Sequence, residues 1–223
     1  MKRNCLMIYI LMGLASSIIY AGDFKRFEIQ PFGGATLTGG IPLESSDNVN
    51  LGTIHVNNSY NAGVTFGVYL NEEDAVEGLW RRMFTKGELP AGFVDPGSSL
   101  SESTFNLKID QYHCNFLHHY TLNDPKAFPY VIGGLGATTY YASQNGQSNS
   151  LTRFSFALGG GIKYFFADHF GLRAEARWAP TVLSASDSRF WCSIGGAGAQ
   201  CVVRLQTTLQ NQVDFTGGVI FRF

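Results

Sequence analysis

The sequence predicts an all-β protein, an eight-stranded antiparallel up-and-down transmembrane β-barrel. Three observations lead to this fold class. The last eleven residues, 213–223, alternate apolar and polar side chains up to a C-terminal phenylalanine, so one face of the strand is apolar and the other is polar. Seven further stretches behave similarly, and the connections between them alternate between long and short. Charged residues make up only 15% of the chain, less than in ordinary soluble domains, as expected of a surface that contacts lipid.

The first four expected strands are defined by alternation and by the turns that bound them. Residues 24–37 place Phe27 and Ile29 on one face and Glu28 on the other. Residues 60–70 alternate in the same way and end at an acidic turn. The strand over 75–86 is less regular and leaves Arg82 on the lipid face, which is tolerable only near the membrane rim. The strand over 104–122 is the longest of these four.

The last four expected strands cover residues 128–142, 152–166, 170–183 and 213–223. The first two are rich in glycine, which permits close packing of a small barrel wall. The long connections cover 38–59, 87–103, 143–151 and 184–211. In outer-membrane barrels long loops lie outside the cell and short turns lie in the periplasm, so both chain ends should lie on the periplasmic side.

The first 21 residues have the pattern of a secretory signal peptide. Lys2 and Arg3 precede an apolar stretch, and small residues lead up to Ala21. The stretch is too short for a transmembrane helix. We therefore expect export through the periplasm, with residues 22–223 forming one barrel domain in the outer membrane of a Gram-negative bacterium. Removal of Lys2 and Arg3 from the 16 basic residues leaves 14 against 17 acidic ones, so nucleic acid is not an expected partner.

The number of aromatic residues decides which face looks inward. A soluble barrel around a ligand would have to enclose the apolar faces, but eight strands leave an interior only wide enough for ordinary side chains. The apolar faces therefore contact lipid, and the interior holds a charge network. Its expected members are Glu28, Glu77, Arg81, Arg173, Glu175, Arg177, Asp214 and Arg222.

Charges enclosed at this density must be paired. We expect Glu175 to pair with Arg173, Arg177 or Arg222, and Glu28 to pair with Arg222 across the first and last strands. Separately hydrated charges in a wet channel are the alternative. A paired network predicts a plugged barrel that does not allow free diffusion of solutes.

Two cysteines bracket a short glycine-rich segment in the last long connection. Such a segment can bring Cys192 and Cys201 together, so we expect a disulfide in the oxidising periplasm. Two independent thiols are the alternative. Cys114 is then left over as a small residue on a strand.

Four segments carry a resemblance to a known family. They are PYVIGGLGA at 129–137, FALGGGIKYF at 156–165, LRAEARW at 172–178 and the ending Phe221-Arg222-Phe223. Through them the mature chain resembles the small porin-like outer-membrane β-barrel domain family, with OmpA/Opa-like barrels. The resemblance implies insertion by the outer-membrane assembly machinery, which reads the terminal aromatics Phe221 and Phe223. It implies little about activity, because members include adhesins and structural barrels.

Catalytic, metal and cofactor sites are not indicated by the sequence. His113 and His119 share a strand face but lie roughly 20 Å apart, too far for joint metal ligation, and His118 points the other way. Ser101 or Ser155 would need a neighbouring histidine and an acid to form a hydrolase site, and no such motif is visible.

The sequence therefore favours a non-enzymatic integral outer-membrane barrel with a structural role, whose long loops contact surfaces or host cells. Phe93, Phe190 and Trp191 are candidate contact residues, although they could equally pack on the rim. Expected partners are outer-membrane lipid and lipopolysaccharide, the assembly machinery and a host or surface ligand. A narrow porin-like channel for small solutes is the alternative, and a lipid-modifying enzyme is a third hypothesis.

Overall fold

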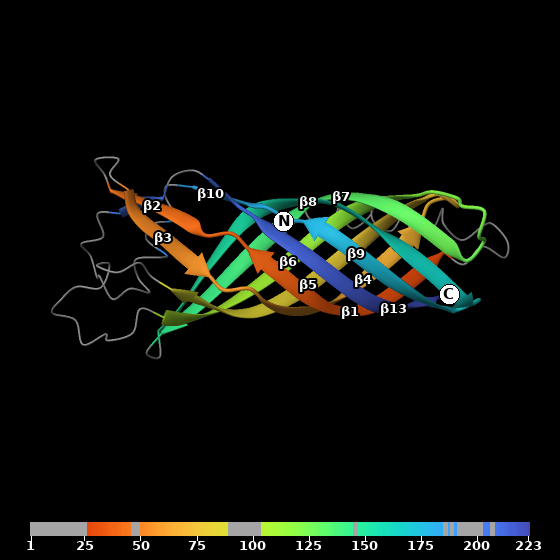
Figure 1. The fold of residues 1–223 in the computed structure, drawn as a ribbon, viewed down its shortest axis with the longest axis horizontal. Helices are drawn as coiled ribbons and strands as arrows, with labels where there is room; N and C mark the ends of the chain where they lie inside the picture. Colours follow the sequence, from red (N-terminus) through yellow and green to blue (C-terminus); the bar gives the residue numbers. More distant parts are fainter. Residues whose placement is uncertain are drawn as a thin grey trace, which may run out of the picture.

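The computed structural model describes residues 26–45, 50–88, 104–144, 147–184, 187, 190, 203–205 and 208–223. Nearly all of them lie in β-strands that wrap around one long axis (Figure 1). No helix within these ranges is long and apolar enough to cross a membrane. The expected signal peptide at 1–21, the cysteine pair Cys192 and Cys201, and the contact candidates Phe93 and Trp191 lie outside the described residues.

Eight long strands close into an antiparallel barrel, so the predicted fold class is confirmed. They are β1 (Phe27–Thr38), β4 (Ser59–Tyr69), β5 (Asp74–Glu88), β6 (Thr104–His119), β7 (Ala127–Gln144), β8 (Gln147–Ala167), β9 (Phe170–Trp178) and β13 (Gln212–Arg222). Each strand pairs with the next along the chain, and β1 also pairs with β13, which closes the ring. Glu28 on β1 is thereby opposite Arg222 on β13.

The apolar strand faces lie on the outside of the barrel and the polar faces on the inside. On β13, for example, Phe215 is 52% exposed whereas the neighbouring Asp214 is 1% exposed. The nine residues of β9 alternate without exception between exposed and buried. An outward face that is apolar and exposed has no partner in water, so the described wall is built to contact lipid.

The two ends of the barrel differ. The turn end carries the short connections at 70–73, 120–126 and 168–169 and the terminal residue Phe223. The loop end carries β2 (Ile41–Ser45) and β3 (Asn50–Val56), a hairpin that extends past the barrel at the left of Figure 1. Three short strands also lie near this end: β10 (Thr181–Leu183), β11 (Val203–Leu205) and β12 (Thr208–Gln210).

These extra strands correct the expected loops. The connection 38–59 contains the β2–β3 hairpin, and 184–211 contributes β11 to β2 and β12 to β10. The expected polar loop 143–151 is also wrong, because β7 and β8 stay paired up to Gln144 opposite Gln147. Lipid does not impose an apolar outward face above the membrane, so these strands lack the alternation by which the others were found.

The interior is apolar at the loop end. A buried cluster fills the barrel there, made of Ile41, Ile54, Val56, Met83, Phe105, Leu107, Ile109, Tyr140, Ala142, Leu151, Leu183 and Phe190. On β3 the apolar Ile54 and Val56 point inward and His55 is exposed. The polarity is therefore the reverse of that in the lipid-facing wall. This end is built as a water-soluble barrel would be, with apolar side chains inside and polar groups outside.

Glycine on β8 permits one close approach inside the barrel. A Cβ on Gly161 would collide with the Tyr130 phenol and with the Ala174 carbonyl oxygen of the neighbouring strand. We expect Gly161→Val to lower the free energy of unfolding by about 2 kcal/mol, because the backbone oxygen cannot yield. The matched control is Gly133→Val on the outer face of β7, where the nearest atom is the flexible Leu158 side chain at 3.6 Å. Urea unfolding in lipid vesicles, followed by tryptophan fluorescence, compares the two variants; equal midpoints would contradict the packing argument.

Candidate functional site: the barrel interior and its turn-end pocket

A cluster of ionised side chains closes the interior near the turn end. The Glu28 carboxylate on β1 accepts hydrogen bonds from Lys163 on β8, from Arg222 Nε on β13 at 3.0 Å and from the Tyr69 hydroxyl on β4 at 2.9 Å. Lys163 Nζ also donates to the Tyr69 hydroxyl at 3.0 Å. One carboxylate thus draws groups from three other strands together across the lumen.

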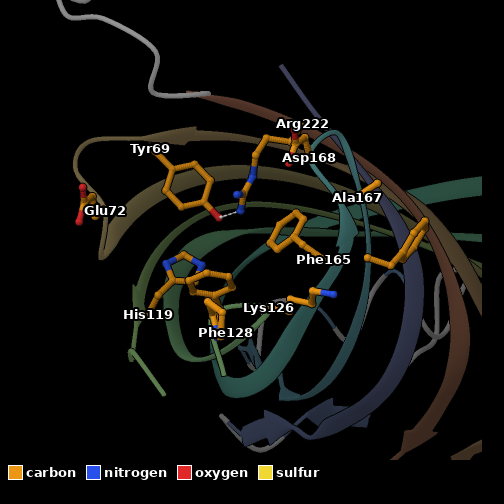
Figure 2. A pocket seen from close by; sticks show the side chains of 11 residues that line it. Tyr69, Glu72, His119, Lys126, Phe128, Phe165, Ala167, Asp168 and Arg222 are labelled. Atoms are coloured by element: carbon orange, nitrogen blue, oxygen red, sulfur yellow. Dashed lines mark hydrogen bonds between the residues drawn. The ribbon is translucent and has the colours of Figure 1, made fainter. Parts of the chain in front are cut away.

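A pocket of about 500 Å³ opens below this cluster toward the turn end. Figure 2 shows Tyr69 and Arg222 pointing toward one another above the pocket, with His119, Phe128 and Phe165 around it. The Arg222 guanidinium lies 3.5 Å from the centre of the Phe165 ring, and Tyr69 stacks on His119 at 5.2 Å. The pocket therefore ends against a wall of stacked and ion-paired groups.

Arg173 on β9 spans the lumen in the next layer. Its guanidinium pairs with Glu77 on the opposite strand β5 and with Glu175 on its own strand, and it donates to Gln30 on β1 at 3.0 Å. Tyr130 on β7 accepts from Arg173 and donates to Glu175 at 2.8 Å. All five side chains are buried. Charge-assisted hydrogen bonds in a low-dielectric interior are strong, so this layer braces opposite walls.

A third layer lies closer to the loop end. Arg81 on β5 pairs with Asp214 on β13 and donates to Gln212 at 3.0 Å. Arg177 lies 3.4 Å from the same Asp214 carboxylate. Gln111 on β6 donates to Gln212 at 2.9 Å, so this strand also contributes to the layer. Above this layer the apolar cluster begins, so side chains occupy the lumen from the turn end to the loop end.

The structure brings most of the expected charge network together. Glu28 and Arg222 pair directly, as do Glu175 and Arg173, and Arg177 Nε lies 4.0 Å from Glu175. Arg222 belongs to the Glu28 layer and does not share a layer with Glu175. Lys163, Tyr69 and Tyr130 also belong to the network, although they were not predicted from the sequence. The available signal was position: each of them falls on the inward face of its strand.

A histidine and a serine meet inside the barrel. His113 Nε2 lies 2.8 Å from Ser155 Oγ, but the two residues are only 4% and 0% exposed. His113 Nδ1 has no hydrogen-bond partner in the described part of the chain, so no carboxylate orients the ring. A serine nucleophile needs both an oriented base and substrate access. The described pair has neither, and its simplest role is to satisfy two buried polar groups.

Phe190 does not offer a contact surface. It was expected from the sequence to be a loop contact residue, but it is 8% exposed and packs in the apolar cluster at the loop end. A contact next to it holds this region in place: Arg153 on β8 donates from both Nε and Nη2 to the Asp187 carboxylate, which also accepts from the Ser184 backbone amide at 2.9 Å. Burial raises the pKa of Asp187, but these hydrogen bonds outweigh it and hold the pKa below its usual value.

Comparison with known proteins places this geometry in a family. The family described as outer membrane protein beta-barrel domain matches residues 12–187. The chain belongs to this family. Membership confirms the resemblance inferred from the sequence and places the barrel in an outer membrane. Strand β13 lies beyond the matched residues, yet it closes the ring between β1 and β9. No curated protein matches the chain in sequence.

Several solved members of the outer-membrane barrel class share this fold. The outer membrane protein OprG of Pseudomonas aeruginosa has 12% identity and a TM-score of 0.56, covering 89% of this chain and 97% of its own. Neisserial surface protein A has 14% identity and a TM-score of 0.54, covering 88% and 97%. The outer membrane protein AlkL, solved in lipid bilayers, has 12% identity and a TM-score of 0.53, covering 92% and 93%. At these identities the likeness is one of fold alone.

Proposed function

We propose that this protein is a non-enzymatic outer-membrane barrel, closed to free diffusion, that acts through the surface it presents outside the cell. The observation that carries the proposal is the filled lumen. Arg173 joins the opposite strands β9 and β5, Arg81 on β5 pairs across the lumen with Asp214 on β13, and Lys163 on β8 pairs with Glu28 on β1 in the third layer. An open pore would need these contacts to break, and breaking a buried ion pair is costly.

The orientation follows from the general rule for such barrels. Short turns lie in the periplasm and long connections lie outside, so the loop end faces the exterior. There the β2–β3 hairpin extends past the barrel and pairs with β11. This hairpin is the part of the described chain best placed to meet a host or surface ligand. The membrane-spanning wall has outer-membrane lipid and lipopolysaccharide as its partners, after export through the periplasm and insertion by the assembly machinery at the C-terminal strand.

Recordings in planar bilayers test whether the lumen is closed. We expect the full-length protein to insert without steady channel openings, because each ionic layer is occupied by paired side chains. Insertion is verified on the same preparation by the faster gel migration of the unboiled, folded barrel. Steady openings of a single conductance would overturn the closed-barrel proposal.

A narrow channel for small solutes is the second candidate, and one observation favours it. Several buried polar atoms along the lumen have no hydrogen-bond partner among the described residues, including Arg177 Nε and Nη1, Gln212 Nε2 and His113 Nδ1. Such atoms favour hydration, and connected waters would make a thin polar path. The conductance experiment separates the two candidates, since a hydrated path gives ion flow and a braced lumen does not.

Two cell-based comparisons test the rest of the proposal. Replacing 45–50 by an Asn-Gly turn shortens the β2–β3 hairpin, and we expect it to abolish attachment of expressing cells to host cells. The control is Glu72→Gln with Glu73→Gln in a turn on the other side of the membrane, which should leave attachment unchanged. Attachment that survives shortening would contradict the role of the hairpin. An altered lipid A mass spectrum in the expressing strain would contradict the non-enzymatic assignment.

A further inference from the structure

The outer wall of β5, β6, β7 and β8 changes character row by row toward the loop end. Hydrogen-bonded register places Trp80 opposite Tyr112, then Arg82 opposite Asp110, then Phe84 opposite Lys108. The continuing rows on β7 and β8 give four levels: Trp80, Tyr112, Ala137 and Phe154; Arg82, Asp110, Thr139 and Thr152; Phe84, Lys108, Tyr141 and Ser150; Lys86, Asn106, Ser143 and Ser148. The wall thus passes from aromatic to basic and polar within a few residues.

The same level marks a change inside the barrel. Met83, Ile109, Tyr140 and Leu151 form one row across these strands and belong to the apolar interior cluster. Below it the interior is ionic and the exterior is apolar. An exterior that becomes polar while the interior becomes apolar marks the height at which lipid tails give way to the interface. The rows that carry Lys108 and Lys86 therefore lie at the level of the outer leaflet's headgroups.

A groove of about 810 Å³ lies in this part of the wall. Its lining combines the two lysines Lys86 and Lys108, the aromatic rings of Phe84 and Tyr141, and amides and hydroxyls that include Asn57, Asn106 and Ser143. The Lys108 ammonium lies 4.6 Å from the centre of the Tyr141 ring, and Lys86 is exposed. None of the described residues that line the groove is a carboxylate.

Nearby carboxylates do not cancel this charge. Asp110, in the row below, is held by a bidentate pair with Arg82 at 2.7 Å. Glu88, above the groove, accepts a hydrogen bond from the neutral Asn57 amide at 3.0 Å and keeps its charge, so it offsets only one of the two lysines. Lys86 and Lys108 therefore give the groove a net positive charge at the edge of the hydrocarbon, which attracts an anion carried by a lipid.

We propose that this groove binds the phosphorylated headgroup of the glycolipid that forms the outer leaflet of an outer membrane. Lys86 and Lys108 contact the phosphate, because ammonium groups are compact donors suited to it. The amides and hydroxyls of Asn57, Asn106 and Ser143 face sugar hydroxyls. Phe84 is 67% exposed and, with Tyr141, packs against the upper parts of the acyl chains. The inference depends on the outer-membrane location of the family and not on the role of the hairpin.

Native mass spectrometry of the folded, detergent-solubilised full chain tests the proposal with bis-phosphorylated lipid A as the probe. We expect one lipid A to bind in preference to the same lipid after removal of its phosphates. Lys86→Gln with Lys108→Gln should weaken binding about tenfold or more, since each lysine near an anionic surface contributes on the order of 1 kcal/mol. The control is Lys126→Gln, an exposed lysine in a turn at the opposite end.

Three results would overturn the proposal. The first is equal lipid A binding by the double variant and the unchanged protein, with both shown to be folded by gel migration. The second is equal binding of phosphorylated and dephosphorylated lipid. The third is displacement of lipid A by glucosamine 1-phosphate at the same concentration, which would assign the groove to a soluble sugar phosphate. Loss of binding confined to the groove variant, with the Lys126→Gln protein unaffected, supports it.

Discussion

Replacing Arg173 by methionine will lower the free energy of unfolding by about 3 to 5 kcal/mol, the largest effect expected of a single change in this chain. Arg173 is buried, and its guanidinium pairs with both Glu77 and Glu175. Without it, Glu77 loses its paired cation in a lumen that has little room for water. Methionine has a similar length and packs well, so the cost reflects the stranded charge and not a cavity. Urea unfolding of the protein in lipid vesicles measures the loss.

A second variant separates charge from packing. Arg173→Met with Glu77→Gln removes the stranded carboxylate, while Glu175 keeps the Tyr130 hydrogen bond at 2.8 Å and the nearby Arg177. We expect this double variant to be more stable than the single one, because an uncharged amide costs less to bury than an unpaired ion. Lys126→Met, which removes an exposed lysine, should change stability by less than about 0.5 kcal/mol. A double variant as unstable as the single one would show that Arg173 acts through packing.

The barrel could be predicted from sequence because lipid imposes a simple rule on each strand. An outward side chain in hydrocarbon must be apolar, and an inward one in a narrow lumen can be polar if it finds a partner. On β9 this gives the sequence LRAEARW, whose alternation is complete. The same rule located β13 and β4. Alternation also placed Arg82 outside, where the structure has it.

The strands at the loop end could not be predicted in this way. Beyond the membrane the outward face meets water and the inward face meets the apolar cluster, so the rule reverses, as Ile54, His55 and Val56 show. A reversed pattern that covers three residues is too short to distinguish from a loop. Phe190 illustrates the same difficulty: an aromatic residue in a polar segment suggests an exposed contact, and only the structure shows that it fills the interior.

The partners of the charge network were only partly predictable. Opposite charges on the first and last strands must meet when a barrel closes, so Glu28 with Arg222 followed from topology. The contact between Arg173 and Glu77 crosses the lumen between strands that are not neighbours, and it depends on the barrel's shear and side-chain lengths. Lys163 was missed because Gly159, Gly160 and Gly161 precede it and hide the alternation on β8. Because glycine has no side chain, its positions do not indicate which face of the strand points inward.

The pair of Arg82 and Asp110 on the outer wall leads to an asymmetric prediction. Their bidentate contact lies one row above the aromatic residues Trp80 and Tyr112. The Arg82 side chain is 35% exposed, whereas Asp110 is 1% exposed beneath it. Arginine has a long stem and can extend its charge toward the headgroups, but the short aspartate cannot. Arg82 therefore tolerates the loss of its partner better than Asp110 does.

We expect Arg82→Ala to lower the midpoint of urea unfolding in lipid vesicles more than Asp110→Ala does, because the first change leaves a buried carboxylate without its cation and the second leaves a part-exposed guanidinium that water can reach. Arg82→Ala with Asp110→Ala should be more stable than Arg82→Ala alone, since no buried charge remains. The matched control is His118→Ala at the turn end, where the outward His118 and Asp74 lie 2.8 Å apart and both are part-exposed. That change should leave the urea midpoint nearly unchanged, because water already screens this pair. Equal effects of the two single changes at Arg82 and Asp110 would mean that the aspartate reaches water, and the outer interface would then lie closer to the turn end than the row of Arg82.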